Sequence, residues 1–218
     1  MPAIETVLFD LDGTLVDTAP DMGNALNTTL IESGRAAMPL EAIRPHVSKG
    51  GSALISLGFA ITTEHDQHEP FRQRFLHHYS EKLAEASTLF EGMSELLNEI
   101  ESRQLRWGII TNKPGWLTDP LLQKMGLYER SACVVSGDTV AHAKPHPLPL
   151  LHACELMDAT PQNCIYIGDH ERDIIAGNAA NMKTLAALWG YIPDDEDPTT
   201  WGADGHLTQP DELLNWII

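Results

Sequence analysis

Short runs of apolar residues alternate with longer amphipathic stretches over most of the chain. The runs at residues 7–9, 105–110, 133–135, 164–167 and 184–189 are apolar at nearly every position, which is typical of strands buried on both faces. Most stretches between them repeat apolar residues every three or four positions, the period of a helix packed along one side. This alternation predicts a parallel sheet with right-handed crossovers, a doubly wound, Rossmann-like α/β fold.

Helices of this fold are expected between the strands. The apolar spacing predicts helices at residues 93–100 and 174–180, and another that ends at Gly126. A further helix is expected to run as far as Leu156, with Pro145 in its first turn, because that position needs no backbone N–H.

The segment that follows the first strand departs from this alternation. Residues 17–87 show helical periodicity and loops, with a first helix that Gly34 is placed to end and a long polar-faced segment at residues 65–86. A helical block in this position indicates an inserted subdomain. We therefore expect an α/β core at residues 1–16 and 88–218 and a small α-helical domain at residues 17–87.

Length and charge narrow the class of protein. The chain has 218 residues, 43% of them hydrophobic, so it is long enough to bury a sizeable core. Asp and Glu number 31 against 14 Lys and Arg, which gives a net charge of −17 at pH 7. This excess of negative charge argues against nucleic-acid binding and against attraction to anionic membranes.

Two features bear on the compartment. The first five residues lack the basic and apolar regions of a signal peptide, and no run approaches the length of a membrane span, so a cytoplasmic location is expected. Cys133, Cys154 and Cys164 are odd in number and lack the spacing of metal ligands. We expect reduced thiols in the core rather than a disulfide or a zinc site.

The apolar runs give way to residues that can carry chemistry. These residues are Asp10, Asp12, Thr111, Asn112, Lys144, Asp169 and Asp173. Ligands of an open α/β sheet bind outside the carboxyl ends of the strands, so the seven side chains belong at one edge. Several carboxylates without a soft ligand predict a Mg²⁺ site, and a hydroxyl and an ammonium opposite it would hold a phosphoryl group.

Asp10 and Asp12 are the most informative pair. Two positions apart in an extended chain, they project to the same side and repel each other. The pair therefore needs a cation, or a division of labour in which one acid is charged and the other protonated. Gly13 allows a sharp turn close to a ligand, and Thr14 adds a donor. For the pair alone, an acidic turn after an N-terminal strand is an equally good interpretation.

In order along the chain, Asp-x-Asp-Gly-Thr, a threonine, a lysine and Gly-Asp-x-x-x-Asp resemble the motifs of the haloacid dehalogenase superfamily. The resemblance covers the whole chain, and the helical block resembles the superfamily's small cap domain. It implies that Asp10 is the nucleophile that forms an aspartyl-phosphate. Asp12 would be the acid for the leaving alcohol and then the base for water, a pattern that phosphatases and phosphomutases have and that dehalogenases and ion pumps lack.

The same resemblance assigns the other core residues. Thr111 would hydrogen-bond the phosphoryl oxygens, and Lys144 would neutralise the nucleophile and the phosphate. Asp169 would bind Mg²⁺ with Asp10 and the main-chain carbonyl of Asp12. Asp173 would support the metal ligands.

Some of these residues, taken singly, have simpler interpretations. Lys144 is compatible with a surface lysine at a helix start, and Asp173 with an acid that the helix dipole favours in a first turn. His170 lies inside the last motif, and we expect it at the rim of the site rather than as a further metal ligand.

Substrate selection is expected in the cap, which in this family closes over the leaving group. Residues 44–51 resemble the loop with which phosphoglycolate phosphatases recognise their substrate, although a solvated turn between helices is the alternative. The predicted substrate-binding residues are Arg44, His46, Ser48 and Lys49 in this loop and Gly13, Thr14 and Asn112 in the core.

Residues 89–93, 107–114, 190–193 and 201–204 resemble N-acetylmuramic acid 6-phosphate phosphatases, a branch close to phosphoglycolate phosphatases that acts in cell-wall sugar recycling. We therefore expect a Mg²⁺-dependent phosphomonoester hydrolase for N-acetylmuramic acid 6-phosphate, with 2-phosphoglycolate as the alternative substrate. Both esters carry a carboxylate, so the cations of the cap loop do not distinguish them. Residues 191–201 are either a wall for a bulky sugar or a solvated acidic connection.

Two hypotheses from other classes stay open. A phosphosugar mutase would use the same core but return the phosphate to a reoriented intermediate. A non-catalytic phosphate-binding module would hold the ester without turnover. In each case the expected partner is a small-molecule phosphate ester, with no nucleic acid or membrane, and the chain is a monomer or a homodimer.

Overall fold

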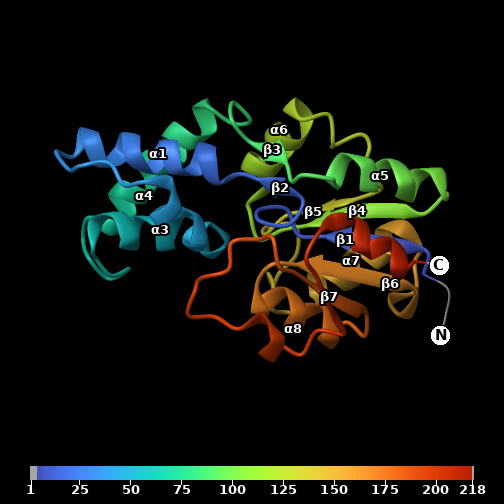
Figure 1. Cartoon of the computed structure of the whole chain (residues 1–218). Coiled ribbons are helices and arrows are strands. Elements are labelled where there is room, and N and C mark those ends of the chain that lie inside the picture. The colour runs from blue at the N-terminus through green and yellow to red at the C-terminus, as the bar shows by residue number, and fades with distance from the viewer. Residues whose placement is uncertain (1–3, 218) are drawn as a thin grey trace.

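Six parallel strands form the central sheet, in the order β5-β4-β1-β6-β7-β8 (Figure 1). The strands are β1 (Thr6–Phe9), β4 (Arg106–Ile110), β5 (Val134–Val135), β6 (Cys164–Gly168), β7 (Lys183–Ala187) and β8 (Gly205–Leu207). The computed structural model describes residues 4–217. Residues 1–3 and 218, which belong to the predicted core and to the N-terminal segment considered for a signal peptide, lie outside the described residues. The predicted doubly wound parallel sheet is confirmed.

The register of the central strands creates one functional edge. β1 lies between β4 and β6, with Phe9 aligned with Ile109 on one side and Ile167 on the other. All residues of β1 are buried, which explains why its sequence has no polar face. Because the three strands end together, the loops that follow them open at the same edge of the sheet.

Helices cover both faces of the sheet. One face packs against α5 (Met93–Ser102), α6 (Gly115–Lys124) and the 3-10 helix η4 (Pro210–Asn215). The other packs against α7 (Leu148–Met157) and α8 (Glu171–Ala179). Two further 3-10 turns, η2 (Pro161–Asn163) and η3 (Pro198–Thr200), lie in connecting loops.

The helical insertion stands beside this core. It contains α1 (Ala19–Glu32), α2 (Leu40–Ile43), the 3-10 helix η1 (Arg44–Lys49), α3 (Gly50–Phe59) and α4 (His68–Glu81). The chain enters and leaves it through β2 (Val16–Asp17) and β3 (Thr88–Leu89), which pair as a small antiparallel ribbon (Figure 1). The predicted boundaries fall within this ribbon, and the division into two domains stays a prediction.

Four element predictions need correction. Pro145 lies in the loop before α7, which begins at Leu148 with Pro149 in its first turn. The helical segment expected at residues 65–86 is helical over α4 alone, because turns precede it and Ala84 takes a left-handed φ of 59°.

The other two corrections concern the far edge of the sheet. β7 stops at Ala187 instead of continuing to Trp189. Shortly after it, Gly190 passes so close to Asp169 that a Cβ on Gly190 would lie 2.1 Å from the Asp169 Cβ. β8 was missed because its sequence, Gly-His-Leu, has no apolar run, and it is recognisable as a strand by its pairing with β7.

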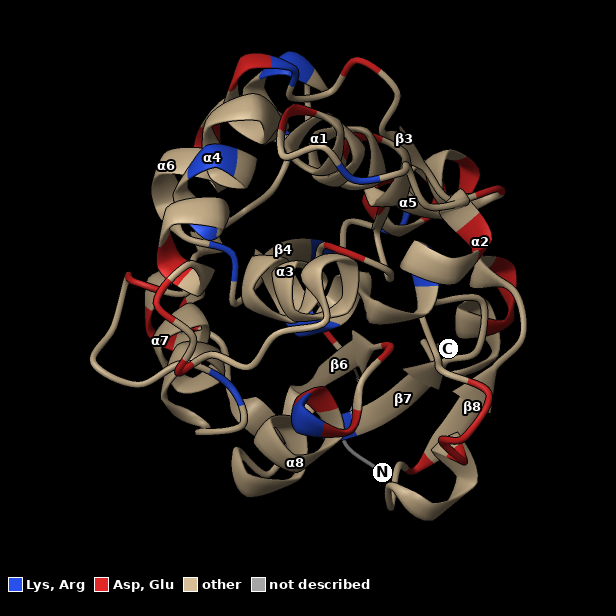
Figure 2. Cartoon of the chain, turned by 90° about the vertical axis from the view of Figure 1, so that its left-hand side faces the viewer, with Lys and Arg blue, Asp and Glu red and all other residues tan. Residues whose placement is uncertain are grey.

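The positions of the charged residues and of the cysteines can be compared with the expectations from the sequence. Acidic residues occur on helices and loops around the molecule, while basic residues on α4 lie at the cap (Figure 2). The three cysteines are free and buried, as expected for core thiols. Among the described helices, none is both long enough and apolar enough to cross a bilayer.

Candidate active site

The loop after β1 folds tightly around its acids. Asp10 is 2% exposed, and its Oδ1 accepts a hydrogen bond of 2.7 Å from the Leu11 N–H. Gly13 has a φ of 91°, and a Cβ at this position would lie 2.1 Å from Asp169 Oδ2. A side chain is therefore excluded here on both conformational and steric grounds. Thr14 is buried behind it and donates to Asp169 Oδ1 at 3.1 Å.

Lys144 lies at the centre of the buried charges. Its Nζ is 2.9 Å from Asp10 Oδ1 and 2.6 Å from Asp173 Oδ1. It also donates to the Tyr166 hydroxyl at 2.7 Å and to the Ile110 carbonyl at 2.9 Å. Lys144 is therefore buried among acids and is not a surface lysine. Asp173 does lie in the first turn of α8, as the simpler interpretation has it, but it is buried and paired with Lys144.

Three carboxylates converge where the sequence predicts a metal. One oxygen each from Asp10, Asp169 and Asp173 lies within 4.8 Å of the others, and all three residues are buried. Asp173 Oδ2 is buried without a hydrogen-bond partner among the described residues. A buried acceptor left unpaired in a cluster of oxygen ligands fits a hard divalent cation.

Proton affinities in this cluster reflect burial and repulsion. Burial raises the pKa of Asp10 to about 6, although the Lys144 ammonium opposes the shift. Burial, together with the charges of Asp10 and Asp173, raises the pKa of Asp169 to about 7. Burial acts on Asp173 in the same direction, but Lys144 and Arg172 hold its pKa below the usual value. The three carboxylates therefore repel one another when ionised, and a bound cation would reduce this repulsion.

Asp12 has a separate environment on the cavity side of the loop. Its Oδ1 accepts hydrogen bonds from the Thr18 hydroxyl at 2.6 Å and from the Lys113 ammonium at 2.7 Å. Lys113 is buried under the ring of Tyr79, 4.8 Å from the ring centroid. Burial alone would lower the pKa of Lys113, but the Asp12 carboxylate raises it above the usual value. The two acids of the first motif are thus paired with different lysines.

Thr111 and Asn112 follow β4 and line the cavity. The Thr111 hydroxyl accepts a 3.1 Å hydrogen bond from the Lys113 N–H. The Asn112 side chain bonds both to the N–H and to the carbonyl of Lys144, at 3.0 and 2.9 Å. In this structure Asn112 therefore holds the backbone that carries Lys144, and its predicted contact with substrate stays a prediction.

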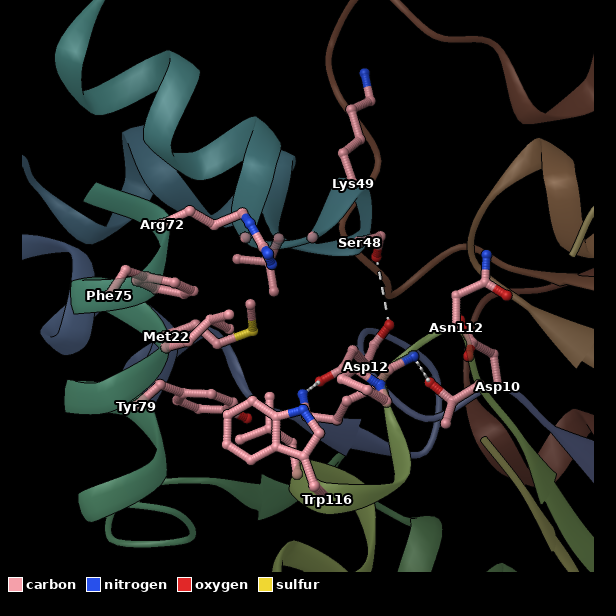
Figure 3. Close-up of a pocket in the computed structure, with 18 of the residues that line it drawn as sticks. Asp10, Asp12, Met22, Ser48, Lys49, Arg72, Phe75, Tyr79, Asn112 and Trp116 are labelled. Carbon is pink, nitrogen blue, oxygen red and sulfur yellow. Dashed lines mark hydrogen bonds and ion pairs between the residues drawn. The ribbon is translucent and has the colours of Figure 1, made fainter. Parts of the chain in front are cut away.

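A cavity of about 630 Å³ separates these core residues from the cap (Figure 3). The cap contributes a largely apolar wall of Met22, Val47, Phe75, Leu76 and Tyr79. Trp116 from α6, 54% exposed, stands on the core side. The cavity therefore has acidic and basic side chains at the Asp10 end, and most of the cap wall named above is apolar.

The cap loop reaches the acidic cluster through Ser48. Its hydroxyl donates to Asp169 Oδ2 at 2.7 Å. The same hydroxyl lies 3.3 Å from the main-chain oxygen of Asp12 (Figure 3). Arg172 donates to the carbonyl of Ser48 from the core. Lys49 also lines the cavity and pairs with Glu196 at 2.8 Å.

The other two predicted cap residues lie elsewhere. Arg44 binds Asp17 with both ends of its guanidinium, at 2.9 Å each, next to the β2–β3 ribbon. His46 is half-buried and, with Arg44, is not among the described residues that line the cavity. Their predicted role in substrate binding stays a prediction.

Tyr191 connects the acidic cluster to the segment through which the chain enters the cap, at the end of β2 and the start of α1. Its N–H donates to Asp169 Oδ2 at 2.8 Å, and its hydroxyl donates to Asp17 Oδ1 at 2.7 Å. The Ala19 N–H donates to the same hydroxyl at 2.9 Å. Residues 191–201 are not among those that line the cavity, and Tyr191 and Trp201 are buried against the core.

His170 caps the N-terminus of α8. Its Nδ1 accepts a 3.3 Å hydrogen bond from the Arg172 N–H. Burial and the nearby charge of Arg172 lower the pKa of His170 to about 4. The ring is therefore neutral at pH 7 and serves the helix end.

Comparisons with known proteins agree with this arrangement. Residues 7–187 match the family model described as haloacid dehalogenase-like hydrolase. This chain belongs to the haloacid dehalogenase-like hydrolases. A phosphoglycolate phosphatase from Xanthomonas campestris pv. campestris is 44% identical, covering 95% of this chain and 93% of the relative. An N-acetylmuramic acid 6-phosphate phosphatase from Pseudomonas putida is 42% identical, covering 98% and 96%.

A crystal structure of a predicted phosphoglycolate phosphatase from Haemophilus somnus has the same fold, with a TM-score of 0.87 over 100% of both chains at 22% identity. Full-length relatives at this similarity are phosphatases, and this haloacid dehalogenase-like hydrolase is a phosphatase too. Its buried acidic triad is where a divalent metal, which such phosphatases generally use, would be held.

Four residues of this hydrolase's site were not singled out from its sequence: Lys113, Tyr166, Arg172 and Tyr191. Lys113 and Arg172 were adjacent to recognised motif residues, but adjacency does not reveal which acid a long side chain will reach. Tyr166 lay inside an apolar run as one more strand residue. Its hydroxyl, 3.1 Å from Asp173 Oδ1, is placed by the tertiary structure alone.

Proposed function

We propose that this phosphatase cleaves phosphate monoesters through an aspartyl-phosphate on Asp10. A carboxylate oxygen of Asp10 attacks phosphorus, the P–O bond to the leaving alcohol breaks, and Asp12 gives its proton to the departing oxygen. Asp12 then takes a proton from water, which attacks the phosphorus of the intermediate and releases inorganic phosphate and free Asp10. The placement of Asp12 on the cavity side, apart from the buried cluster, supports this division of roles.

Basic and hydroxyl groups around Asp10 would stabilise the transferring phosphoryl group. Lys144, 2.9 Å from Asp10 Oδ1, would offset the charge of nucleophile and phosphate. Thr111 and Arg172 line the same end of the cavity, and the Nε of Arg172 is buried without a partner among the described residues. A buried donor in this position supports an anionic ligand there.

The acidic cluster would hold Mg²⁺. Asp10, Asp169 and the main-chain oxygen of Asp12 would be its ligands, with Asp173 supporting them. When bound, the ion would neutralise charge on the phosphoryl oxygens as phosphorus is transferred. Removal of the ion is expected to abolish turnover. Full activity after thorough chelation would refute the metal requirement.

For the substrate, we propose N-acetylmuramic acid 6-phosphate and, with it, a role in cell-wall sugar recycling. The observation that carries this proposal is the cavity: about 630 Å³, flanked by apolar cap residues and by the exposed ring of Trp116. Such a volume suits a sugar, whereas a two-carbon acid would leave most of it filled with water. The relative from P. putida with this activity supports the same choice.

2-Phosphoglycolate remains a second candidate, because the X. campestris relative named for that activity is equally similar. Phosphate release with Mg²⁺ should be compared for both esters, N-acetylglucosamine 6-phosphate and β-glucose 1-phosphate. We expect kcat/KM to favour the muramic ester by at least about tenfold, or about 1.4 kcal/mol. A preference for 2-phosphoglycolate would refute the sugar substrate, and isomerised sugar phosphate without release of phosphate would indicate a mutase.

A further inference from the structure

Four cationic side chains line the cavity: Lys49, Arg72, Lys113 and Arg172. Two of them form contacts at the end of the cavity where Asp10 and Asp12 lie. Lys113 is bound to Asp12 at 2.7 Å, and Arg172 holds the Ser48 carbonyl beside the acidic cluster. They are therefore placed to act on phosphate and on the acid–base group rather than on a distant part of the leaving group.

Lys49 and Arg72 remain as cations for the far end of the cavity. Lys49 is paired with Glu196 of the core and extends away from Asp10 and Asp12 (Figure 3). Arg72 projects from α4 on the opposite side of the cavity from Asp10, with its guanidinium directed inward (Figure 3). Of the two, Arg72 faces the space that a leaving group would fill.

The present partner of Arg72 is easily exchanged. Glu69, one turn earlier on the same helix, accepts from Nε at 2.7 Å and from Nη2 at 2.8 Å. The Glu69 side chain is 57% exposed, and ion pairs so open to solvent contribute little to stability. The guanidinium fork is thus already arranged for a carboxylate, and replacing one carboxylate by another has a small net cost.

Arg44, the arginine of the cap loop at residues 44–51, lacks this freedom. Both ends of its guanidinium are taken by Asp17, and the group lies 5.6 Å from the centroid of the Tyr191 ring. Breaking this pair would disturb the ribbon through which the cap joins the core. The ion pair of Arg72 with Glu69 lies within α4 and does not hold the cap to the core.

We infer that Arg72 binds the carboxylate of the leaving group, which replaces Glu69 as the partner of the guanidinium when substrate enters. The inference rests on the proposed function, because the muramic ester differs from N-acetylglucosamine 6-phosphate by a carboxylate-bearing ether. The apolar side chains of Phe75 and Leu76, one turn further along the same helix, also line the cavity, and a leaving group packed against them would shield the guanidinium from water. An ion pair formed there is stronger than one in open solvent.

The test compares Arg72→Met with Arg74→Met as a matched control. Arg74 is on the same helix but packs on Phe71 and donates to Ser33 instead of lining the cavity. The measured quantity is the ratio of kcat/KM for N-acetylmuramic acid 6-phosphate to that for N-acetylglucosamine 6-phosphate. Arg72→Met is expected to lower this ratio at least tenfold, mainly through KM, and Arg72→Lys to restore part of it. Arg74→Met is expected to keep the ratio within twofold.

Other outcomes separate this inference from the proposed substrate. A ratio unchanged by Arg72→Met, or equally lowered by Arg74→Met, overturns the role of Arg72 while the substrate proposal stands. If the wild type prefers 2-phosphoglycolate, the sugar proposal fails, and the same variants are compared on 2-phosphoglycolate and ethyl phosphate. A selective loss on 2-phosphoglycolate then supports Arg72 as the carboxylate-binding residue, and an equal loss on both esters overturns it.

Discussion

Replacing Asp169 by asparagine is expected to stabilise the metal-free protein at pH 8 and to remove its response to Mg²⁺. The reason is the raised proton affinity of this carboxyl, whose pKa moves from 3.8 to about 7 through burial and the charges of Asp10 and Asp173. An acid whose pKa is raised by folding favours the folded state while protonated. That stabilisation is present below pH 4 and is lost as the pH rises towards 7.

The size of the effect follows from the same shift. At about 1.4 kcal/mol per pKa unit, ionising Asp169 costs the metal-free folded state on the order of 4 kcal/mol by pH 8. Asparagine stays neutral, and its carbonyl can still accept from the Tyr191 N–H and the Ser48 hydroxyl. Its amide would donate to the Thr14 hydroxyl, which now donates to Asp169. Allowing for imperfect geometry, we expect a gain of about 2 kcal/mol, or about 6 °C in Tm.

The assay is thermal unfolding of chelated protein at pH 5 and pH 8, with and without Mg²⁺. The wild type should lose stability between the two pH values when chelated and regain it with Mg²⁺. Asp169→Asn should lose less, because only Asp10 then keeps a raised pKa, and it should respond little to Mg²⁺. Asp21→Asn is the matched control. Asp21 is also buried, but it accepts from the Ala86 N–H and from the N–H and hydroxyl of Ser87, so its replacement should destabilise. A lower Tm for Asp169→Asn at pH 8, or an undiminished Mg²⁺ response, would refute the reasoning.

Three further substitutions probe the site. Asp10→Asn should lower the rate of phosphate release at least about 10³-fold, with an unchanged circular dichroism spectrum, because it removes the nucleophile; a smaller loss would contradict this role. Trp116→Ala should raise KM for sugar phosphates about fivefold and affect ethyl phosphate much less, as steady-state kinetics would show, since the indole is expected to contact a ring. Tyr191→Phe loses the hydroxyl contacts with Asp17 and Ala19, so unfolding in urea should show a loss of about 1–2 kcal/mol. An unchanged urea midpoint would show that these contacts add no stability.

The chemistry of the strand ends was predictable because it is encoded locally. An apolar run fixes a buried strand, and the residue after the run must lie at the sheet edge, so Asp10 and Thr111 follow directly from their sequence neighbours. The repeated pattern then fixes parallel strands, which bring these ends together. β8 was not predicted because its sequence has no apolar run, and it is a strand only through its pairing with β7.

The sequence by itself determined the parallel sheet, the helical insertion and the acids and lysine that meet at the Asp10 end. The tertiary structure decided which cation each carboxylate receives. Lys113 forms an ion pair with Asp12, Lys144 with Asp10 and Arg44 with Asp17. Such long side chains can reach several acids, and the choice among them depends on distances between segments far apart in the chain. Those distances are set when the cap packs on the core, and no local pattern of residues contains them.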